Sequence, residues 1–150
     1  MRIQDLLITI EKQFRKQILG SVSDENELYL EVSASGIRDI CSKLCSEFGC
    51  TLISLFAMDD RETKGHFTVC YTFAQRSSGL LIILALAADP VQRSFPSISE
   101  KIPAASLYER EIHDLFGLYP IGHPDPKRMV FHSNWPENNY PLRRDFLISC

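Results

Sequence analysis

Three strand-like runs follow one another closely in the middle of the chain. Residues 51–58, 67–74 and 80–88 are rich in aliphatic, aromatic and β-branched side chains, and only a few residues separate each run from the next. Such short connections join antiparallel neighbours, because a parallel crossover needs a dozen residues or more. In the middle run, large apolar residues occupy every second position from Phe67 to Phe73. The sequence therefore predicts an antiparallel meander with one buried face.

The segments before the meander alternate between helical and strand periodicity. Apolar residues recur at helical spacing over residues 3–18, which predicts an amphipathic helix that stops at Gly20 and packs on the domain's own sheet. Apolar and polar residues then alternate over 28–32, as in a half-buried strand. Helical spacing returns over 37–48 and ends at Gly49.

Helical signals also follow the meander. Ser97 and Glu100 have the spacing of a capping box, which predicts a short helix. Pro103 suits the first turn of a second helix that we expect to run to Phe116 and to close at Gly117. Glu109 would border the buried face of that helix.

The remaining residues, 118–150, show no regular period. They hold five of the eight prolines together with Trp135, Tyr119 and Tyr140, so they are too aromatic for a solvated linker. We expect this tail to lie along a surface of its own domain or of a partner. The prediction is an α+β two-layer domain, with an antiparallel meander sheet covered by helices in residues 1–117 and an extended C-terminal tail in 118–150.

Composition excludes several classes of function. The formal net charge of -3 and the pI near 5.8 argue against a nucleic-acid partner. The longest apolar run, 80–88, is too short for a membrane helix, and the N-terminal segment lacks a cleavage site, so we expect a cytoplasmic protein. Five cysteines without a CxxC pair indicate reduced thiols, with Cys41 continuing a buried helix face.

The densest cluster of charged residues lies between Glu109 and Asp114. Arg110 and Asp114 are one helical turn apart and are expected to pair, with Asp114 and Glu111 pointing away from the apolar face. An enzyme hypothesis would make Glu111, Asp114 and His123 the metal site of an independent hydrolase, although the HExxH spacing is absent. Nucleotide-binding glycine loops and nucleophile motifs are also absent, so we expect no catalytic residue, metal or cofactor in this chain.

Two long motifs resemble a known family. The string EREIHDLFGLYPIGHPDPKRMV at 109–130, followed by WPENNYPLRRDF, is similar to the two landmarks of the complex I 30-kDa subunit family, a component of respiratory NADH dehydrogenase. Arg144 stands where that family has Lys. The resemblance covers most of residues 25–147, and WPE before YPLRRDF is closer to versions attached to membrane-bound [NiFe]-hydrogenases and formate hydrogenlyases.

The resemblance implies a non-catalytic subunit in the hydrophilic arm of a membrane-associated oxidoreductase complex. It would dock onto the large catalytic subunit, beside iron–sulfur subunits, and support electron transfer coupled to ion translocation. The flavin, iron–sulfur clusters and quinone or NiFe centre would belong to those other chains. The protein would be peripheral on the inner face of the cell membrane, held there through the complex.

The docking surface that the resemblance implies comprises the signature helix and the tail. Its expected residues are Glu109, Arg110, Glu111, Asp114, His123, Pro124, Arg128, Pro141, Leu142, Arg143, Arg144 and Asp145. The paired arginines offer bidentate contacts to carboxylates at an interface, and they are equally suited to tying the tail to its own domain. The metal-dependent hydrolase and a soluble domain that binds an unrelated ligand stand as alternatives.

Overall fold

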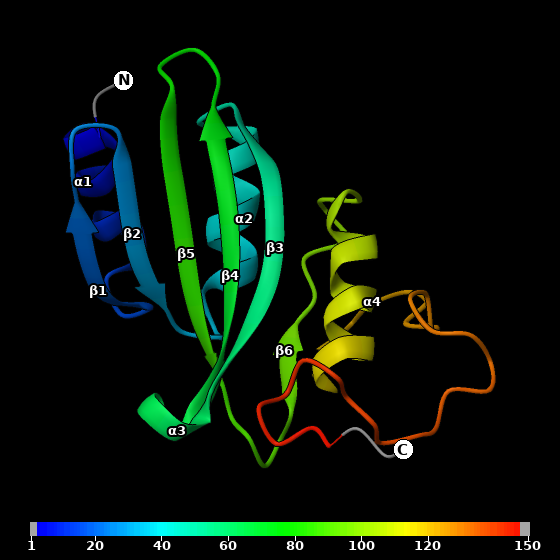
Figure 1. The fold of residues 1–150 in the computed structure, drawn as a ribbon. Helices are drawn as coiled ribbons and strands as arrows, with labels where there is room; N and C mark the ends of the chain where they lie inside the picture. The colour runs from blue at the N-terminus through cyan, green and yellow to red at the C-terminus, as the bar shows by residue number, and fades with distance from the viewer. Residues whose placement is uncertain (1–2, 148–150) are drawn as a thin grey trace.

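The computed structural model describes residues 3–147 as an α+β domain, which confirms the predicted class (Figure 1). None of the helices in this range is both long and apolar enough to cross a bilayer. The elements, in chain order, are α1 (Ile3–Phe14), β1 (Ile18–Ser23), β2 (Glu27–Val32), α2 (Ile37–Ser46), β3 (Cys50–Asp60), α3 (Arg61–Lys64), β4 (His66–Gln75), β5 (Leu80–Ala88), β6 (Ser94–Pro96), α4 (Ala105–Phe116) and β7 (Tyr119–Ile121).

Five strands form the main sheet in the order β1-β2-β5-β4-β3. The predicted meander β3-β4-β5 is confirmed, with Tyr71 opposite both Leu55 and Leu84. β2 joins the sheet as a parallel neighbour of β5, and β1 pairs antiparallel with β2 at the edge. The N-terminal strand pair therefore lies against the last strand of the meander.

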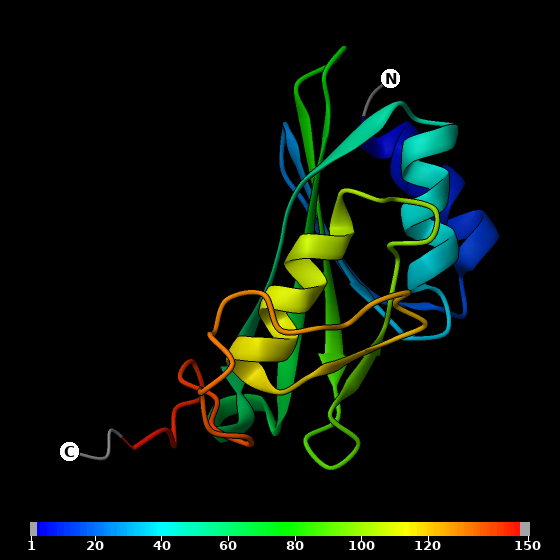
Figure 2. The same ribbon diagram turned by 90° about the vertical axis from the view of Figure 1, so that its right-hand side faces the viewer.

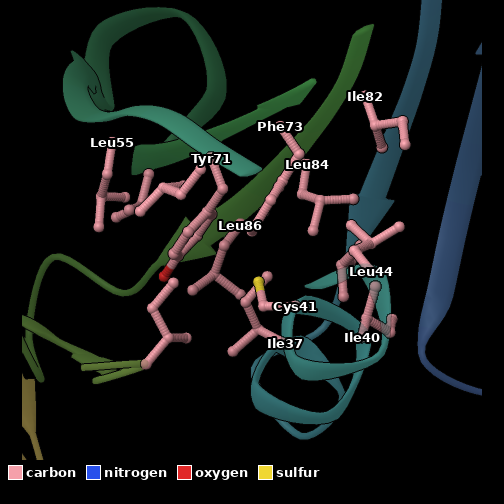
Figure 3. Packing of buried hydrophobic residues seen from close by; sticks show 14 of the residues in the cluster. Ile37, Ile40, Cys41, Leu44, Leu55, Tyr71, Phe73, Ile82, Leu84 and Leu86 are labelled. Carbon is pink, nitrogen blue, oxygen red and sulfur yellow. The ribbon is translucent and has the colours of Figure 1, made fainter. Parts of the chain in front are cut away.

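Helices α1 and α2 cover one face of this sheet and form the second layer (Figures 1 and 2). Figure 3 shows Ile37, Cys41 and Leu44 of α2 on the side of the helix that faces Tyr71 and Leu86 of the sheet. All five are at most 1% exposed, and full burial of each large aliphatic side chain contributes about 1.5–3 kcal/mol. Cys41 is thus a core residue, as expected.

The N-terminal helix is shorter than predicted. It ends at Phe14, and Ile18 begins the edge strand β1, which carries a bulge between Ile18 and Gly20. Ile18 continues the helical spacing, yet its backbone pairs with Val32 of β2. Periodicity over four residues cannot separate the last turn of a helix from the first residue of a strand when both face the same core.

The capping-box prediction is wrong. Residues 97–102 form no helix, and the hydroxyl of Ser97 accepts a hydrogen bond from the Ser99 N–H at 3.2 Å, two residues onward, as in a turn. The strand β6 just before it pairs in parallel with β7, although no strand was expected after Gly117. Gly117 does end α4, with φ +74°.

Candidate functional site

Two charged side chains of α4 hold the first part of the tail. Arg110 donates from Nε and Nη2 to the carbonyls of residues 127 and 128, at 2.9 and 3.2 Å. Asp114 Oδ2 accepts hydrogen bonds from the N–H groups of residues 129 and 130, both at 2.8 Å. The expected Arg110–Asp114 pair is therefore absent from this part of the structure. Asp114 is only 5% exposed because the tail covers it, so it is not free on the surface of the domain.

The two glutamates of the signature helix have opposite environments. Glu109 is 0% exposed, and its Oε1 accepts a hydrogen bond from the Ile98 N–H at 2.9 Å. Its Oε2 is buried and has no hydrogen-bond partner within residues 3–147. Burial raises the pKa of the Glu109 carboxyl, and the neighbouring hydroxyl of Ser97 opposes that shift. Glu111 is exposed, as predicted.

His123 joins the tail to the first turn of α4. Its Nδ1 accepts a hydrogen bond from the Asp125 N–H at 2.9 Å, so Nε2 carries the proton and donates to the Ser106 carbonyl at 3.2 Å. The ring is buried, whereas Pro124 beside it is exposed. His123 therefore fixes the tail to the helix within this domain.

The paired arginines also contact their own domain. Arg143 Nε donates to the Phe116 carbonyl at the end of α4, at 2.7 Å, and its guanidinium lies 4.3 Å from the Tyr140 ring centroid. Arg144 donates from N and Nε to Oδ2 and the carbonyl of Asp59, at 2.8 and 2.9 Å. The structure thus supplies the tail-fixing contacts that were one of the two expected roles.

Some of the remaining tail residues make contacts within the domain, and others have exposed side chains. Arg128 donates from Nη1 to the Trp135 carbonyl at 2.7 Å, and the Trp135 ring stacks on Phe131. Pro141 is half-buried. The Leu142 N–H donates to the Leu115 carbonyl at 3.1 Å, while the Leu142 side chain is 51% exposed.

Asp59 and Arg61 form an ion pair that sequence reasoning missed. Arg61 holds both carboxylate oxygens of Asp59, at 2.8 and 2.7 Å, and its Nη2 also reaches Asp145 of the tail at 2.9 Å. These bonds hold the pKa of Asp59 well below its usual range. The sequence placed residues 59–65 in a connection, and an Asp-x-Arg spacing by itself carries no sign of burial.

A second missed residue is Arg38 on α2. It donates from Nε to the Ser97 carbonyl at 3.0 Å and from Nη2 to the Ile121 carbonyl at 2.6 Å. One side chain therefore ties α2 to the residue that follows β6 and to the last residue of β7. Only the long-range fold brings these groups together, so no local pattern signals the contact.

Apolar side chains remain exposed over α4 and the tail. Half of the fourteen exposed large hydrophobic residues in the described range lie between residues 107 and 147, and these seven are Leu107, Tyr119, Ile121, Met129, Val130, Leu142 and Leu147. Within residues 3–147, no three His, Cys, Asp or Glu side chains converge as ligands for a metal ion, so Glu111, Asp114 and His123 do not form such a group. Cys150 and its thiol lie outside the described residues.

The same α+β fold occurs in two solved structures. A chain of the archaeal membrane-bound sulfane sulfur reductase, described as a respiratory membrane complex, matches at TM-score 0.79 and 26% identity, over 97% of this chain and 85% of the other. A trypsin-resistant fragment of Nqo5 matches at TM-score 0.68 over 83% of this chain and 99% of the fragment, and at 18% identity this likeness concerns the fold alone. The chain is thus an α+β domain of the type found in these proteins.

Sequence comparison then defines the family. Residues 30–149 match the family described as the respiratory-chain NADH dehydrogenase 30 Kd subunit, and the chain belongs to this family. It is 32% identical to one of the NADH-quinone oxidoreductase subunits of Rhodobacter capsulatus, over 97% of this chain and 73% of that protein. It is 34% identical to hydrogenase-4 component G and 32% identical to formate hydrogenlyase subunit 5 of Escherichia coli K12, over 87% and 95% of this chain. The chain spans about a quarter of the length of these two relatives.

Proposed function

We propose that this chain is a non-catalytic subunit of a membrane-associated oxidoreductase complex and docks onto the large catalytic subunit through α4 and the tail. Family membership supports the kind of complex. The observation that carries the docking role is the set of seven exposed apolar side chains over α4 and the tail. Apolar groups exposed on an ordered backbone favour association with another protein.

The host complex that we propose is of the complex I or energy-converting hydrogenase type. The likeness to hydrogenase-4 component G and to formate hydrogenlyase subunit 5, together with the WPE segment, favours the hydrogenase and formate hydrogenlyase branch. In this proposal the flavin, iron–sulfur clusters and quinone or NiFe centre belong to partner subunits. The chain is held at the inner face of the cell membrane through those partners, where it supports electron transfer coupled to ion translocation.

Because Arg143 and Arg144 fix the tail to its own domain, other residues are better suited to test this proposal. Charge reversal at Arg143 or Arg144 would break bonds to the chain's own α4 and β3, so a lost partner would be ambiguous. The side chains of Val130 and Leu142 are exposed instead, at 46% and 51%. Their replacement by Asp places charge on the proposed interface and leaves the backbone hydrogen bonds that fix the tail in place.

The experiment is co-purification of the tagged full chain with the large catalytic subunit of its host complex. We expect the double variant Val130→Asp, Leu142→Asp to retain at least tenfold less large subunit than wild type, since buried apolar anchors at interfaces contribute about 1–2 kcal/mol each and about 1.4 kcal/mol corresponds to a tenfold change in affinity. The matched control is Leu19→Asp, Val22→Asp on the edge strand β1, where both side chains are also exposed. Equal retention by wild type and the tail variant, or equal loss in the control, would contradict the docking role.

A further inference from the structure

A cavity lies between the last turn of α4 and residues 128–140, which we call the tail loop. In Figure 1 this part of the tail, drawn in orange, runs beside α4. The cavity has a volume of about 190 Å³. One water molecule takes up roughly 30 Å³ of the liquid, whereas pockets for cofactors and drug-sized molecules measure about 300–1,000 Å³. The cavity is therefore large enough for a single side chain and too small for a typical cofactor.

The tail loop is held in place by its own hydrogen bonds and by α4. Arg128 Nη1 donates to the Trp135 carbonyl at 2.7 Å, and Trp135 Nε1 donates to the Asn139 carbonyl at 2.8 Å. Asp114 Oδ2 fixes the start of the loop by accepting hydrogen bonds from two of its N–H groups, both at 2.8 Å. Because the wall of the cavity is already ordered, binding a ligand there costs less conformational entropy.

Two carboxylates, those of Asp114 and Glu137, line the cavity. Asp114 Oδ1 has no hydrogen bond within residues 3–147, although it is not sealed from solvent. Asp114 as a whole is only 5% exposed, so little water screens its charge. It also lies in the last turn of α4, where the partial negative charge of the helix end favours cations. Glu137 is exposed and forms no ion pair in the described part of the chain, so both carboxylates are available to a cationic ligand.

Arg128 also lines the cavity and would repel a cation. Its side chain is exposed, and its Nη1 already donates to the Trp135 carbonyl. Water therefore screens the charge of Arg128 more than it screens the charge of Asp114. With His113 counted as uncharged, the described wall carries two carboxylates and one guanidinium, so it attracts a cation more strongly than an anion.

Aromatic side chains complete the wall. Trp135 stacks on Phe131, with ring centroids 4.3 Å apart, and Tyr140 also lines the cavity. The guanidinium of Arg143 already lies over the Tyr140 ring, 4.3 Å from its centroid, so one ring of this wall accepts a guanidinium within the domain. A planar guanidinium stacks on aromatic faces and donates to carboxylates in a fixed fork, whereas a lysine ammonium is a point charge. The wall therefore fits arginine better than lysine.

We propose that this cavity receives an arginine side chain of the partner protein, held by Asp114 Oδ1 and Glu137 against the aromatic wall. The inference rests on the proposed function and deepens it, since it names the group that the partner presents. Met129 and Val130, in the same tail loop, are among the exposed apolar residues that carry the docking proposal. One partner could therefore cover these apolar side chains and fill the cavity together.

The test is a titration of the full, ¹⁵N-labelled chain with N-acetyl-arginine amide, followed by the indole N–H resonance. Trp135 is the single tryptophan of the chain, so this resonance reports on the wall of the cavity. N-acetyl-citrulline amide has nearly the same shape as the arginine probe but no charge. We expect the citrulline probe to bind at least about tenfold more weakly, because charge-assisted hydrogen bonds to the carboxylates are lost.

A pair of protein variants tests the same contact from the other side. Glu137→Gln removes one carboxylate of the wall and should weaken binding of the arginine probe about threefold, since water partly screens this exposed side chain. The matched control is Glu25→Gln in the turn between β1 and β2, where the side chain is also exposed, and it should leave the affinity unchanged. Thermal unfolding verifies that both variants are folded.

Equal affinities for the arginine and citrulline probes, or equal affinities of the two variants for the arginine probe, would overturn the inference, because the charges of the cavity would then play no part. Tighter binding of N-acetyl-glutamate amide would also overturn it, by assigning the cavity to an anion held by Arg128. Specific binding of the arginine probe without co-purification of the large subunit would instead contradict only the proposed function. Co-purification without specific binding of the arginine probe would contradict only this inference.

Discussion

Glu109 and Glu111 are two positions apart on α4, about 200° around the helix axis. Glu109 is fully buried and receives the Ile98 N–H, whereas Glu111 is exposed. The charge pattern of the signature helix therefore combines a structural residue with a surface residue. Replacing the carboxyl of Glu109 by an amide should therefore affect stability differently from the same replacement at Glu111.

We predict that Glu109→Gln flattens the dependence of stability on pH. Burial raises the pKa of Glu109, so the folded state binds its proton more tightly than the unfolded chain does. The wild-type free energy of unfolding should therefore fall as pH rises from about 4.5 through the raised pKa. Gln keeps an acceptor for Ile98 and does not titrate, so the variant should be at least as stable as wild type at neutral pH.

Urea unfolding over this pH interval measures the Glu109 effect, with Glu111→Gln as the exposed control that should follow wild type. A Glu109→Gln variant with the wild-type slope would contradict the prediction. So would a loss of more than about 2 kcal/mol at neutral pH, because that would mean that the carboxylate itself supports the fold.

At the scale of elements, the end of α4 is the point where helix and tail meet. Gly117 has φ +74°, and its N–H donates to the His113 carbonyl at 2.9 Å. A Cβ at this position would lie 2.6 Å from Arg143 Nη2 and from the Tyr140 ring. The glycine is therefore required both by the left-handed backbone and by the close approach of the tail.

We predict that Gly117→Ala destabilises the domain by more than Gly79→Ala does. Gly79 has a similar φ of +75°, but a Cβ added there would meet nothing within 4 Å, so it isolates the backbone cost of about 1–2 kcal/mol. Overpacking at Gly117 should add about 1–3 kcal/mol, and should also loosen the tail. Urea unfolding measures the first effect and the rate of proteolysis after residue 117 measures the second. Equal losses in the two variants would show that the tail does not pack on Gly117.

At the scale of the whole molecule, Asp59 connects the end of β3 with α3 and the C-terminal segment. Arg61 holds its carboxylate, Arg144 donates to it, and Asp145 completes the link through Arg61. Residues far apart in the sequence thus meet around one buried carboxylate. The packing of the C-terminal segment on the sheet depends on its negative charge.

We predict that lowering the pH weakens the contacts that Asp59 makes with α3 and the C-terminal segment. Since the pKa of Asp59 is lowered in the folded state, its contribution to stability is complete above the unfolded-state pKa of about 3.9 and is lost as pH falls below it. Asp59→Asn should cost about 3–5 kcal/mol at pH 7, as for other broken buried ion pairs. It should also make the free energy of unfolding less dependent on pH below about 4. Chemical unfolding between pH 7 and pH 3 tests this, with the exposed Glu62→Gln as control, and a steeper acid loss in Asp59→Asn than in wild type would refute it.

The sequence located the elements whose signals are local. The alternation in β4, the helical spacing of α2 and the glycine after α4 all depend on neighbours a few residues away, and all three elements are confirmed. The candidate site was predicted less completely. The string around Glu109 pointed to the right helix and placed Glu109 beside its apolar face and Glu111 away from it, but it gave no sign that the tail would bury Asp114.

The sequence by itself determined the α+β class, the meander and the helix that carries the signature, because periodicity and glycine conformations are properties of short segments. Only the tertiary structure decided that β1 is a strand, that β2 lies parallel to β5, and that Asp59, Arg38 and Asp114 tie distant segments together. The physical reason is that burial and charge pairing depend on groups brought together by the fold. The sequence shows that a residue carries a carboxylate, but it does not show whether that carboxylate contacts a guanidinium or water.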